Sequence, residues 1–216
     1  MFIEQVIPYT TKEGNEYLIK FSEFKPESLP ICIGIKVIDI TLYQVKKVKQ
    51  NSHELSTVGK FLRPLIPFLR IGFKNQAIKK SGCNAAMAYT LENAVTGIYP
   101  AYEIDYANVL VSEGLLTEAL NPSAVSSTAG KIEFTWEDNS DDTYAESTDK
   151  AMLVVYNLVK KRAVTVVGGN TRTGGTQTIM LPASFSGDEV QCFIGFQNGN
   201  QSVMSNSQFV IGLIVL

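Results

Sequence analysis

The sequence predicts a mainly β protein with a helical segment (α+β), whose C-terminal half is a seven-stranded immunoglobulin- or fibronectin III-like β-sandwich. From about residue 106 onward, apolar residues alternate with a period of two in short runs, separated by links rich in Gly, Ser and Asn. Between residues 51 and 105, apolar residues recur every three or four positions, which is typical of helices. Residues 1–50 contain alternating and β-branched runs. We therefore expect three parts: 1–50, 51–105 and 106–216.

The N-terminal part is expected to be rich in β-structure. The run EYLIKFSEF alternates between apolar and polar residues, and ICIGIKVID is rich in β-branched residues. The segment KPESLP between them carries the prolines of a turn. These patterns predict strands from the first residues to about residue 45.

The helical segment is predicted from an apolar stripe that would lie on one face of a helix. The stripe consists of Val58, Phe61, Leu62, Leu65, Leu69 and Phe73. Pro64 and Pro67 oppose one straight helix, because proline lacks an amide hydrogen and crowds the preceding turn. We expect a kinked helix or two short ones. Another helix follows in SGCNAAMAYTLENAVTG, with Ser81 or Asn84 as its N-cap and Gly97 as its stop.

The strands of the sandwich are expected in seven runs: NVLVSE, GKIEFTW, KAMLVVYN, RAVTVVG, TQTIMLP, EVQCFIGF and QFVIGLIVL. The segments LNPSAVSSTAG, GGNTRTGG, ASFSGD and QNGNQ carry turn residues and are interpreted as links. Alternation places Trp136 on the same side of its strand as Ile132 and Phe134, so Trp136 is expected in the core between the sheets. Cys192 is interpreted as a small buried apolar residue rather than a nucleophile.

Composition argues against several classes of protein. The formal net charge of -2 provides no basic field for nucleic acid. The three cysteines show no CxxC spacing, and His53 is the single histidine, so we expect no disulfide framework, zinc site or cofactor. No run is apolar and long enough to insert into a membrane. The first residues show no signal peptide, which leaves the cytoplasm or a phage-like or other assembly as locations.

An acidic stretch follows the strand that contains Trp136 and reads EDNSDDTYAESTD. Its carboxylates could bind Ca²⁺, and Asp138, Asp141 and Asp142 are the candidate ligands. Their spacing does not match an EF-hand loop, so we interpret the stretch as an exposed loop between two core strands. The glycines of GGNTRTGG likewise indicate a hairpin rather than a phosphate-binding loop, because no Lys and no helix follow.

The sequence contains no catalytic constellation. There is no GxSxG motif, and a single histidine cannot be paired with a serine from sequence. A hydrolase stays a remote alternative that would need a pocket with two carboxylates or a serine beside His53.

Three tyrosines, Tyr99, Tyr102 and Tyr106, surround Pro100 where the helical part should meet the sandwich. One interpretation is a packing seam between the two parts. The other is an exposed aromatic patch that binds a protein or a glycan.

Several strings resemble known families. FTWEDN, DKAMLVVYN, TQTIMLP and GDEVQCFIGFQN together resemble a fibronectin type III or related immunoglobulin-like module. More narrowly, KFLRPLIPFLRIGFKNQA and GCNAAMAYTLENAVTGIYPAYEIDYANVLVSEG resemble an uncharacterised family of Bacteroidota proteins known as a domain of unknown function. This resemblance covers about residues 55–216 and implies no activity or catalytic residue. Members commonly begin with a Gly-rich GxxGKxGxxxG-like stretch, which residues 1–50 lack.

The leading hypothesis for function is a non-enzymatic structural or protein-interaction module that associates with itself or a partner. Assembly by strand addition would use ICIGIKVIDI or FVIGLIVL. The alternative is a ligand-binding module for carbohydrate or Ca²⁺.

Overall fold

The computed structural model describes residues 4–10, 16–22, 36–37, 41–76 and 81–216, with side chains from residue 52 onward. The chain forms two compact units, Met1–His53 and Glu54–Leu216. The expected helical segment from residue 54 onward and the expected sandwich both lie in the second unit.

The first unit contains a three-stranded antiparallel sheet in the order β1-β2-β3. Its strands are β1 (Glu4–Thr10), β2 (Glu16–Ser22) and β3 (Lys36–Val37). The strand expected in EYLIKFSEF is β2. Of the strand expected in ICIGIKVIDI, only Lys36–Val37 lies within the described residues.

Helix α1 (Thr41–Leu62) begins earlier than the sequence predicted. The expectation of strands to about residue 45 is wrong for residues 41–45, where β-branched residues were given too much weight. Leu, Lys and Gln from residue 42 onward are good helix formers, and they continue directly into the apolar stripe.

The helical stripe is broken into pieces at its prolines, as expected. After α1 come the 3₁₀ turn η1 (Arg63–Leu65) and α2 (Ile66–Gly72), and each of these carries its proline in the first helical positions, where no amide hydrogen is needed. Helix α3 (Gly82–Asn93) follows the turn η2 (Lys74–Gln76). Among the described residues, no helix combines the length and apolar character needed to cross a lipid bilayer.

The two expected caps of α3 had different outcomes. Ser81 is the N-cap, and its hydroxyl accepts a hydrogen bond from the Asn84 amide at 3.2 Å. Gly97 does not stop the helix, which ends at Asn93; it lies in the next strand with φ +87°. A Cβ atom there would lie 2.3 Å from the Ala101 carbonyl oxygen, so the hairpin requires glycine at this position.

That hairpin pairs β4 (Val95–Ile98) with β5 (Ala101–Ile104), and its turn contains the cis Tyr99–Pro100 peptide. The 3₁₀ turn η3 (Tyr106–Asn108) follows, and Asp105 caps it by accepting from the Ala107 amide.

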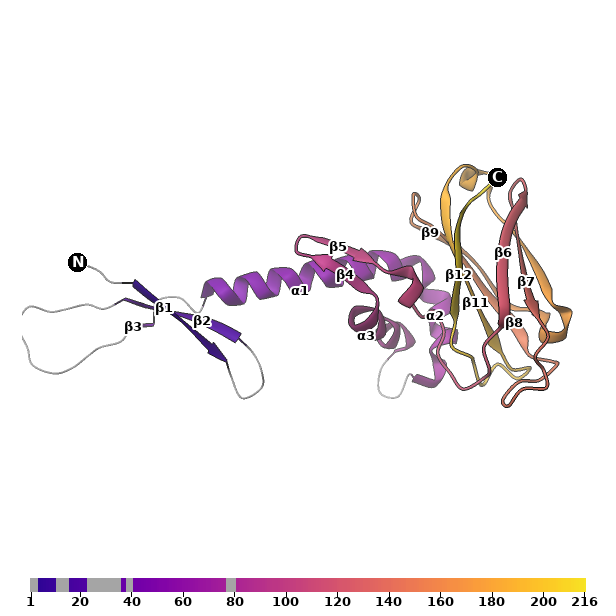
Figure 1. Ribbon diagram of the computed structural model, residues 1–216, viewed down its shortest axis with the longest axis horizontal. Helices are drawn as coiled ribbons and strands as arrows, with labels where there is room; N and C mark the ends of the chain where they lie inside the picture. The colour runs from indigo at the N-terminus through magenta and orange to yellow at the C-terminus, as the bar shows by residue number, and fades with distance from the viewer. Residues whose placement is uncertain (1–3, 11–15, 23–35, 38–40, 77–80) are drawn as a thin grey trace, which may run out of the picture. The chain divides into compact units, whose positions relative to one another are not determined.

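Two antiparallel sheets pack face to face in the C-terminal part of the second unit (Figure 1). One has the order β10-β7-β6 and the other the order β12-β11-β8-β9. Their strands are β6 (Leu120–Thr128), β7 (Lys131–Glu137), β8 (Lys150–Asn157), β9 (Arg162–Thr171), β10 (Thr176–Met180), β11 (Glu189–Gln197) and β12 (Gln208–Ile214).

The first strand of the sandwich is not the one expected. NVLVSE runs as an irregular link, whereas LNPSAVSSTAG, interpreted as a loop, contains β6. Val109 and Val111 alternate because both are buried against the helices. In β6 the one buried residue is Ala124, so the strand lacks the apolar alternation by which strands are recognised.

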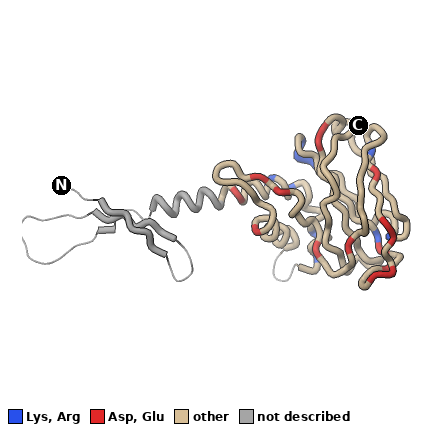
Figure 2. Tube along the Cα trace, viewed as in Figure 1, with Lys and Arg blue, Asp and Glu red and all other residues tan. Residues whose placement is uncertain are grey.

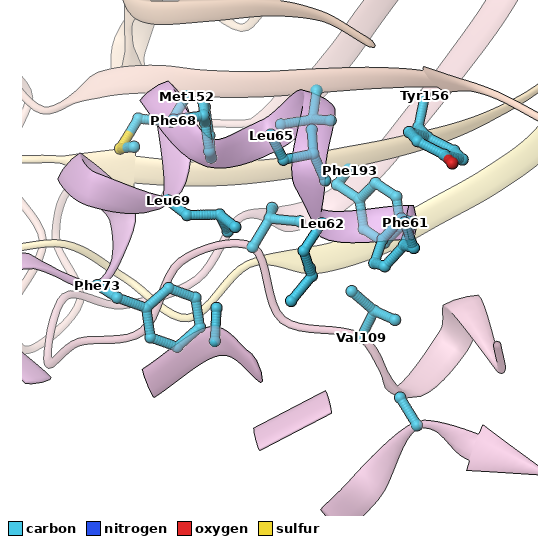
Figure 3. Packing of buried hydrophobic residues seen from close by; sticks show 14 of the residues in the cluster. Phe61, Leu62, Leu65, Phe68, Leu69, Phe73, Val109, Met152, Tyr156 and Phe193 are labelled. Atoms are coloured by element: carbon cyan, nitrogen blue, oxygen red, sulfur yellow. The ribbon is translucent and has the colours of Figure 1, made fainter. Parts of the chain in front are cut away.

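The four-stranded sheet is covered on both faces. In β8, Met152, Val154 and Tyr156 join the helix-facing core, while Ala151, Leu153 and Val155 alternate with them and join the sandwich core. The helix-facing core contains every residue of the predicted apolar stripe (Figure 3). The sandwich core contains Ile132, Phe134, Trp136, Val190, Cys192, Ile194 and Phe196, which confirms the expected core positions of Trp136 and Cys192.

The link between the helices and the sandwich is held by hydrogen bonds from its amides to side chains and by one close backbone contact. The Ser207 hydroxyl accepts from the amides of Val111 (2.8 Å) and Ser112 (3.3 Å). Further along, the Gly114 amide donates to Asn206 Oδ1 at 3.2 Å. A Cβ atom on Gly114 would lie 2.0 Å from the Met204 carbonyl oxygen, so only glycine allows this approach.

Gly114→Ala is therefore expected to destabilise the protein by about 2 kcal/mol or more, because the link must move away from Met204. Gly199→Ala is the control, since its added methyl group meets no atom within 4 Å and should change stability by less than about 0.5 kcal/mol. Urea unfolding followed by circular dichroism measures both. Equal stability of the two variants would show that the link tolerates a side chain.

Candidate binding pocket

The acidic stretch forms the exposed loop between β7 and β8, at the end of the sandwich away from the C-terminus (Figure 2). Asp138 accepts a hydrogen bond from the Ser140 amide at 3.0 Å, and Asp142 accepts from the Asn139 side chain at 3.0 Å. Asp141 is exposed. Among the described residues, no group of three His, Cys, Asp or Glu side chains is arranged to hold a metal ion.

The last carboxylate of the stretch, Asp149, is buried and pairs with Arg172. Both side chains are 0% exposed, and Asp149 Oδ2 accepts from Arg172 Nη2 at 3.1 Å and Nε at 3.3 Å. Burial lowers the pKa of the Arg172 guanidinium, and the charge of Asp149 opposes that shift. The pair ties the end of the acidic loop to the link that follows β9.

The remaining donors of Arg172 are also satisfied within the protein. Nη1 donates to Asn139 Oδ1 at 2.6 Å, and Nη2 donates to the Thr117 carbonyl at 2.9 Å. The guanidinium lies 3.9 Å from the ring centroid of Phe196, in a cation–π contact. The Trp136 indole in turn donates to the Arg172 carbonyl at 2.7 Å. This network is structural, and the sequence showed it only as one Arg in a glycine-rich link.

Arg172→Met is expected to cost about 3–5 kcal/mol, because it leaves the buried Asp149 carboxylate without a partner. Arg172→Met combined with Asp149→Asn should cost less, since the unpaired charge is then removed. Lys160→Met breaks the partly exposed pair with Asp188 and should cost about 1 kcal/mol or less. Thermal unfolding of the three variants checks this order; a double variant as unstable as Arg172→Met would contradict it.

A pocket of about 410 Å³ opens on the helix-facing side of the four-stranded sheet, where α1 ends. We call it the tyrosine pocket. Three segments of the second unit build it: the end of α1, the β5 strand with the residues after it, and the end of β8 with its turn. Its lining residues are Thr57, Lys60, Phe61, Tyr102, Glu103, Ile104, Tyr106, Tyr156 and Lys161.

Aromatic rings form one wall of the tyrosine pocket. Phe61 packs edge-to-face on Tyr156, with ring centroids 4.9 Å apart, and on Tyr106, at 5.5 Å. The Tyr106 and Tyr156 rings lie 6.3 Å apart. Figure 3 shows Phe61 and Tyr156 at one end of the helix-facing core, where the core reaches the pocket.

The tyrosine hydroxyls are held in their neutral form. Burial raises the pKa of Tyr156 to about 12, with a smaller contribution from Tyr106. Burial also raises the pKa of Tyr106, and partial desolvation together with a hydrogen bond to Glu54 raises that of Tyr102. Tyr156 is 1% exposed, yet its hydroxyl forms no hydrogen bond with any residue that the structure describes. A hydroxyl that lines a pocket and has no hydrogen-bond partner in the protein is suited to bind a ligand.

Charged residues complete the tyrosine pocket. Lys60 lies on the last turn of α1, and Glu103 lies on β5. Lys161 occupies the β8–β9 turn with φ +52°. The Asn157 side chain shapes this turn by accepting from the Lys160 amide at 2.7 Å and donating to Asp188 at 2.8 Å.

The structure places the three tyrosines selected from the sequence in two settings. Tyr102 and Tyr106 line the pocket, whereas Tyr99 lies at the hairpin turn, 41% exposed, beside Ile98 at 82%. Their role in interaction stays a prediction. Sequence reasoning missed Phe61, Tyr156 and both lysines as site residues, because they come from distant segments and no local motif marks them.

Tyr156→Phe is expected to change how stability depends on pH. Because the folded-state pKa of Tyr156 is raised from 10.0 to about 12, the unfolded chain releases this proton first, and stability is lost as pH rises through this range. The variant lacks this loss. Urea unfolding at pH 9, 10 and 11 should show the wild type declining more steeply; parallel curves would contradict the assignment. Cys192, whose pKa is also raised to about 12, titrates in both proteins and cancels.

The protein is thus mostly β, with antiparallel sheets, a helical layer on one sheet, and a tyrosine-lined pocket where that layer meets the sheet. The chain belongs to a family of unknown function, DUF6266, which matches residues 37–212. This match begins in front of α1 rather than near residue 55. No curated protein matches the chain.

Proposed function

We propose that the chain is a non-enzymatic binding module and that the tyrosine pocket is its binding site. The observation that carries this proposal is Tyr156, a residue only 1% exposed that lines the pocket and whose hydroxyl forms no hydrogen bond with a described residue. Ligand sites are typically concave and mostly apolar, with a few polar groups that orient the ligand. Phe61, Ile104 and the tyrosine rings supply the apolar surface, and the hydroxyls and charges supply the orientation.

The chemistry of the lining supports binding rather than catalysis. The described lining residues include no Ser, Cys or His, so neither a Ser–His nor a Cys–His pair can form among them. Glu103 is the single carboxylate among them, whereas hydrolysis of a glycosidic bond uses two. The Cys192 thiol lies in the sandwich core, and burial raises its pKa to about 12, which disfavours the reactive thiolate.

The sandwich is further proposed to be of the immunoglobulin or fibronectin III type. Strands β6, β7 and β10 share one sheet, and β8, β9, β11 and β12 share the other, which supports a Greek-key order of this kind. The buried Trp136 packs edge-to-face on Phe196 of the facing sheet, as expected for the core of such a sandwich. The Bacteroidota affiliation stays a prediction.

Self-association by strand addition is a second candidate. The expected strand FVIGLIVL overlaps β12, which lies at the edge of the four-stranded sheet and exposes Ile211 (43%) and Ile214 (56%). An edge strand with exposed apolar residues can pair with another chain.

Ligand-observed NMR with a fragment library tests the proposed binding site. Some fragments should bind the wild type, and their dissociation constants should rise at least about threefold in Tyr156→Phe, which loses one hydrogen bond. Tyr144→Phe is the matched control, because Tyr144 is 71% exposed on the acidic loop. Fragments that bind all three proteins equally, or no binding at all, would contradict the proposal.

A further inference from the structure

The tyrosine pocket carries enough chemical detail to define the class of its ligand. Its volume of about 410 Å³ is near the lower end of the range for small-ligand sites. It therefore suits a single ring with one polar group, or one or two residues of a peptide.

Charge in the lining favours an anion. Lys60 and Lys161 contribute two ammonium groups and Glu103 one carboxylate, which leaves one net positive charge among the lining residues. Glu54 lies outside the lining, and its carboxylate is engaged by the Tyr102 hydroxyl. A ligand with a single negative charge would balance the pocket and receive charge-assisted hydrogen bonds from the lysines.

The hydroxyls favour a hydrogen-bond acceptor. The hydroxyls of Tyr106 and Tyr156 form no hydrogen bond with described residues, and both stay protonated at neutral pH. A neutral tyrosine hydroxyl can donate to an oxyanion, whose oxygens accept without needing to donate in return. The lysine ammonium groups and the tyrosine hydroxyls can thus both donate hydrogen bonds to an oxyanion.

The aromatic wall favours a flat apolar group beside that acceptor. Phe61 meets each tyrosine ring edge-to-face, the two tyrosine rings are tilted by 34° to each other, and all three residues line the pocket. A planar ring can pack against them with the offset or edge-to-face geometry that aromatic groups prefer.

We infer that the tyrosine pocket binds a monocarboxylate carried on a flat apolar group, with Lys60, Lys161 and the Tyr156 hydroxyl receiving the carboxylate and Phe61 contacting the apolar part. This inference rests on the proposed binding function. The same chemistry is present in a small aromatic acid and in a glutamate next to a phenylalanine in a partner protein.

Matched probes separate charge from shape. Benzoate and benzamide have nearly the same shape, but only benzoate carries the negative charge. In NMR titrations of the full chain, benzoate should bind at least about fivefold more tightly than benzamide, because charge-assisted hydrogen bonds are stronger than neutral ones. Lys60→Gln and Lys161→Gln should each reduce this preference, while Lys74→Gln, an exposed lysine outside the pocket, should leave it unchanged.

A peptide arm distinguishes the two sources of the carboxylate. A blocked peptide with Phe followed by Glu is compared with the same peptide carrying Gln. Tighter binding of the Glu peptide than of benzoate assigns the carboxylate to a partner protein, and the reverse assigns it to a free acid. Either result supports the inference.

Other outcomes overturn it. Equal binding of benzoate and benzamide, tighter binding of inorganic phosphate, or Tyr156-dependent binding of methyl glucoside without benzoate would reject the carboxylate but leave the binding function intact. Failure of every probe and of the fragment library would reject both. Unchanged thermal unfolding of the lysine variants ensures that a lost preference reflects the pocket rather than misfolding.

Discussion

Burial of the four-stranded sheet on both faces is the constraint on which the second unit depends. Strands β8 and β11 have no residue free to face water over most of their length, and this burial requires one cover of helices and one cover of strands. The alternation of Met152, Val154 and Tyr156 with Leu153 and Val155 divides one strand between two cores. Neither the helical segment nor the facing sheet is expected to be stable as a separate domain, since each completes the burial of the same sheet.

The tyrosine pocket is a consequence of this layering. Tyr156 is the last member of the helix-facing row on β8, and Phe61 is near the end of α1, so their contact marks where the helical layer stops covering the sheet. Beyond that point the β4–β5 hairpin and the β8–β9 turn supply Tyr102 and Lys161 instead of more apolar packing. Polar groups can therefore lie against a rigid apolar wall, which is the arrangement that holds a ligand in a defined orientation.

The acidic loop shows how one carboxylate of a polar stretch becomes part of the fold while its neighbours stay exposed. Its exposed carboxylates are solvated or hydrogen-bonded within the loop. Asp149, in contrast, is buried and paired with the buried Arg172. Arg172 satisfies its donors through Asn139 and backbone carbonyls, so the network anchors both links at one end of the sandwich. The sequence alone does not distinguish Asp149 from the other carboxylates of the stretch, because its buried partner lies 23 residues further along the chain.

Local sequence patterns alone identified the features that depend on residues close together in the chain. The apolar stripe of α1 and α2, the N-cap Ser81, the proline break and the core position of Trp136 follow from spacing within one segment. The tertiary structure decided the rest. It made β6 a strand although it has little to bury, and it made the alternating segment after η3 a link, because hydrogen-bonding partners outweigh local pattern. It also joined Phe61, Tyr106 and Tyr156 into one wall, since packing between distant segments leaves no mark in any local run of residues.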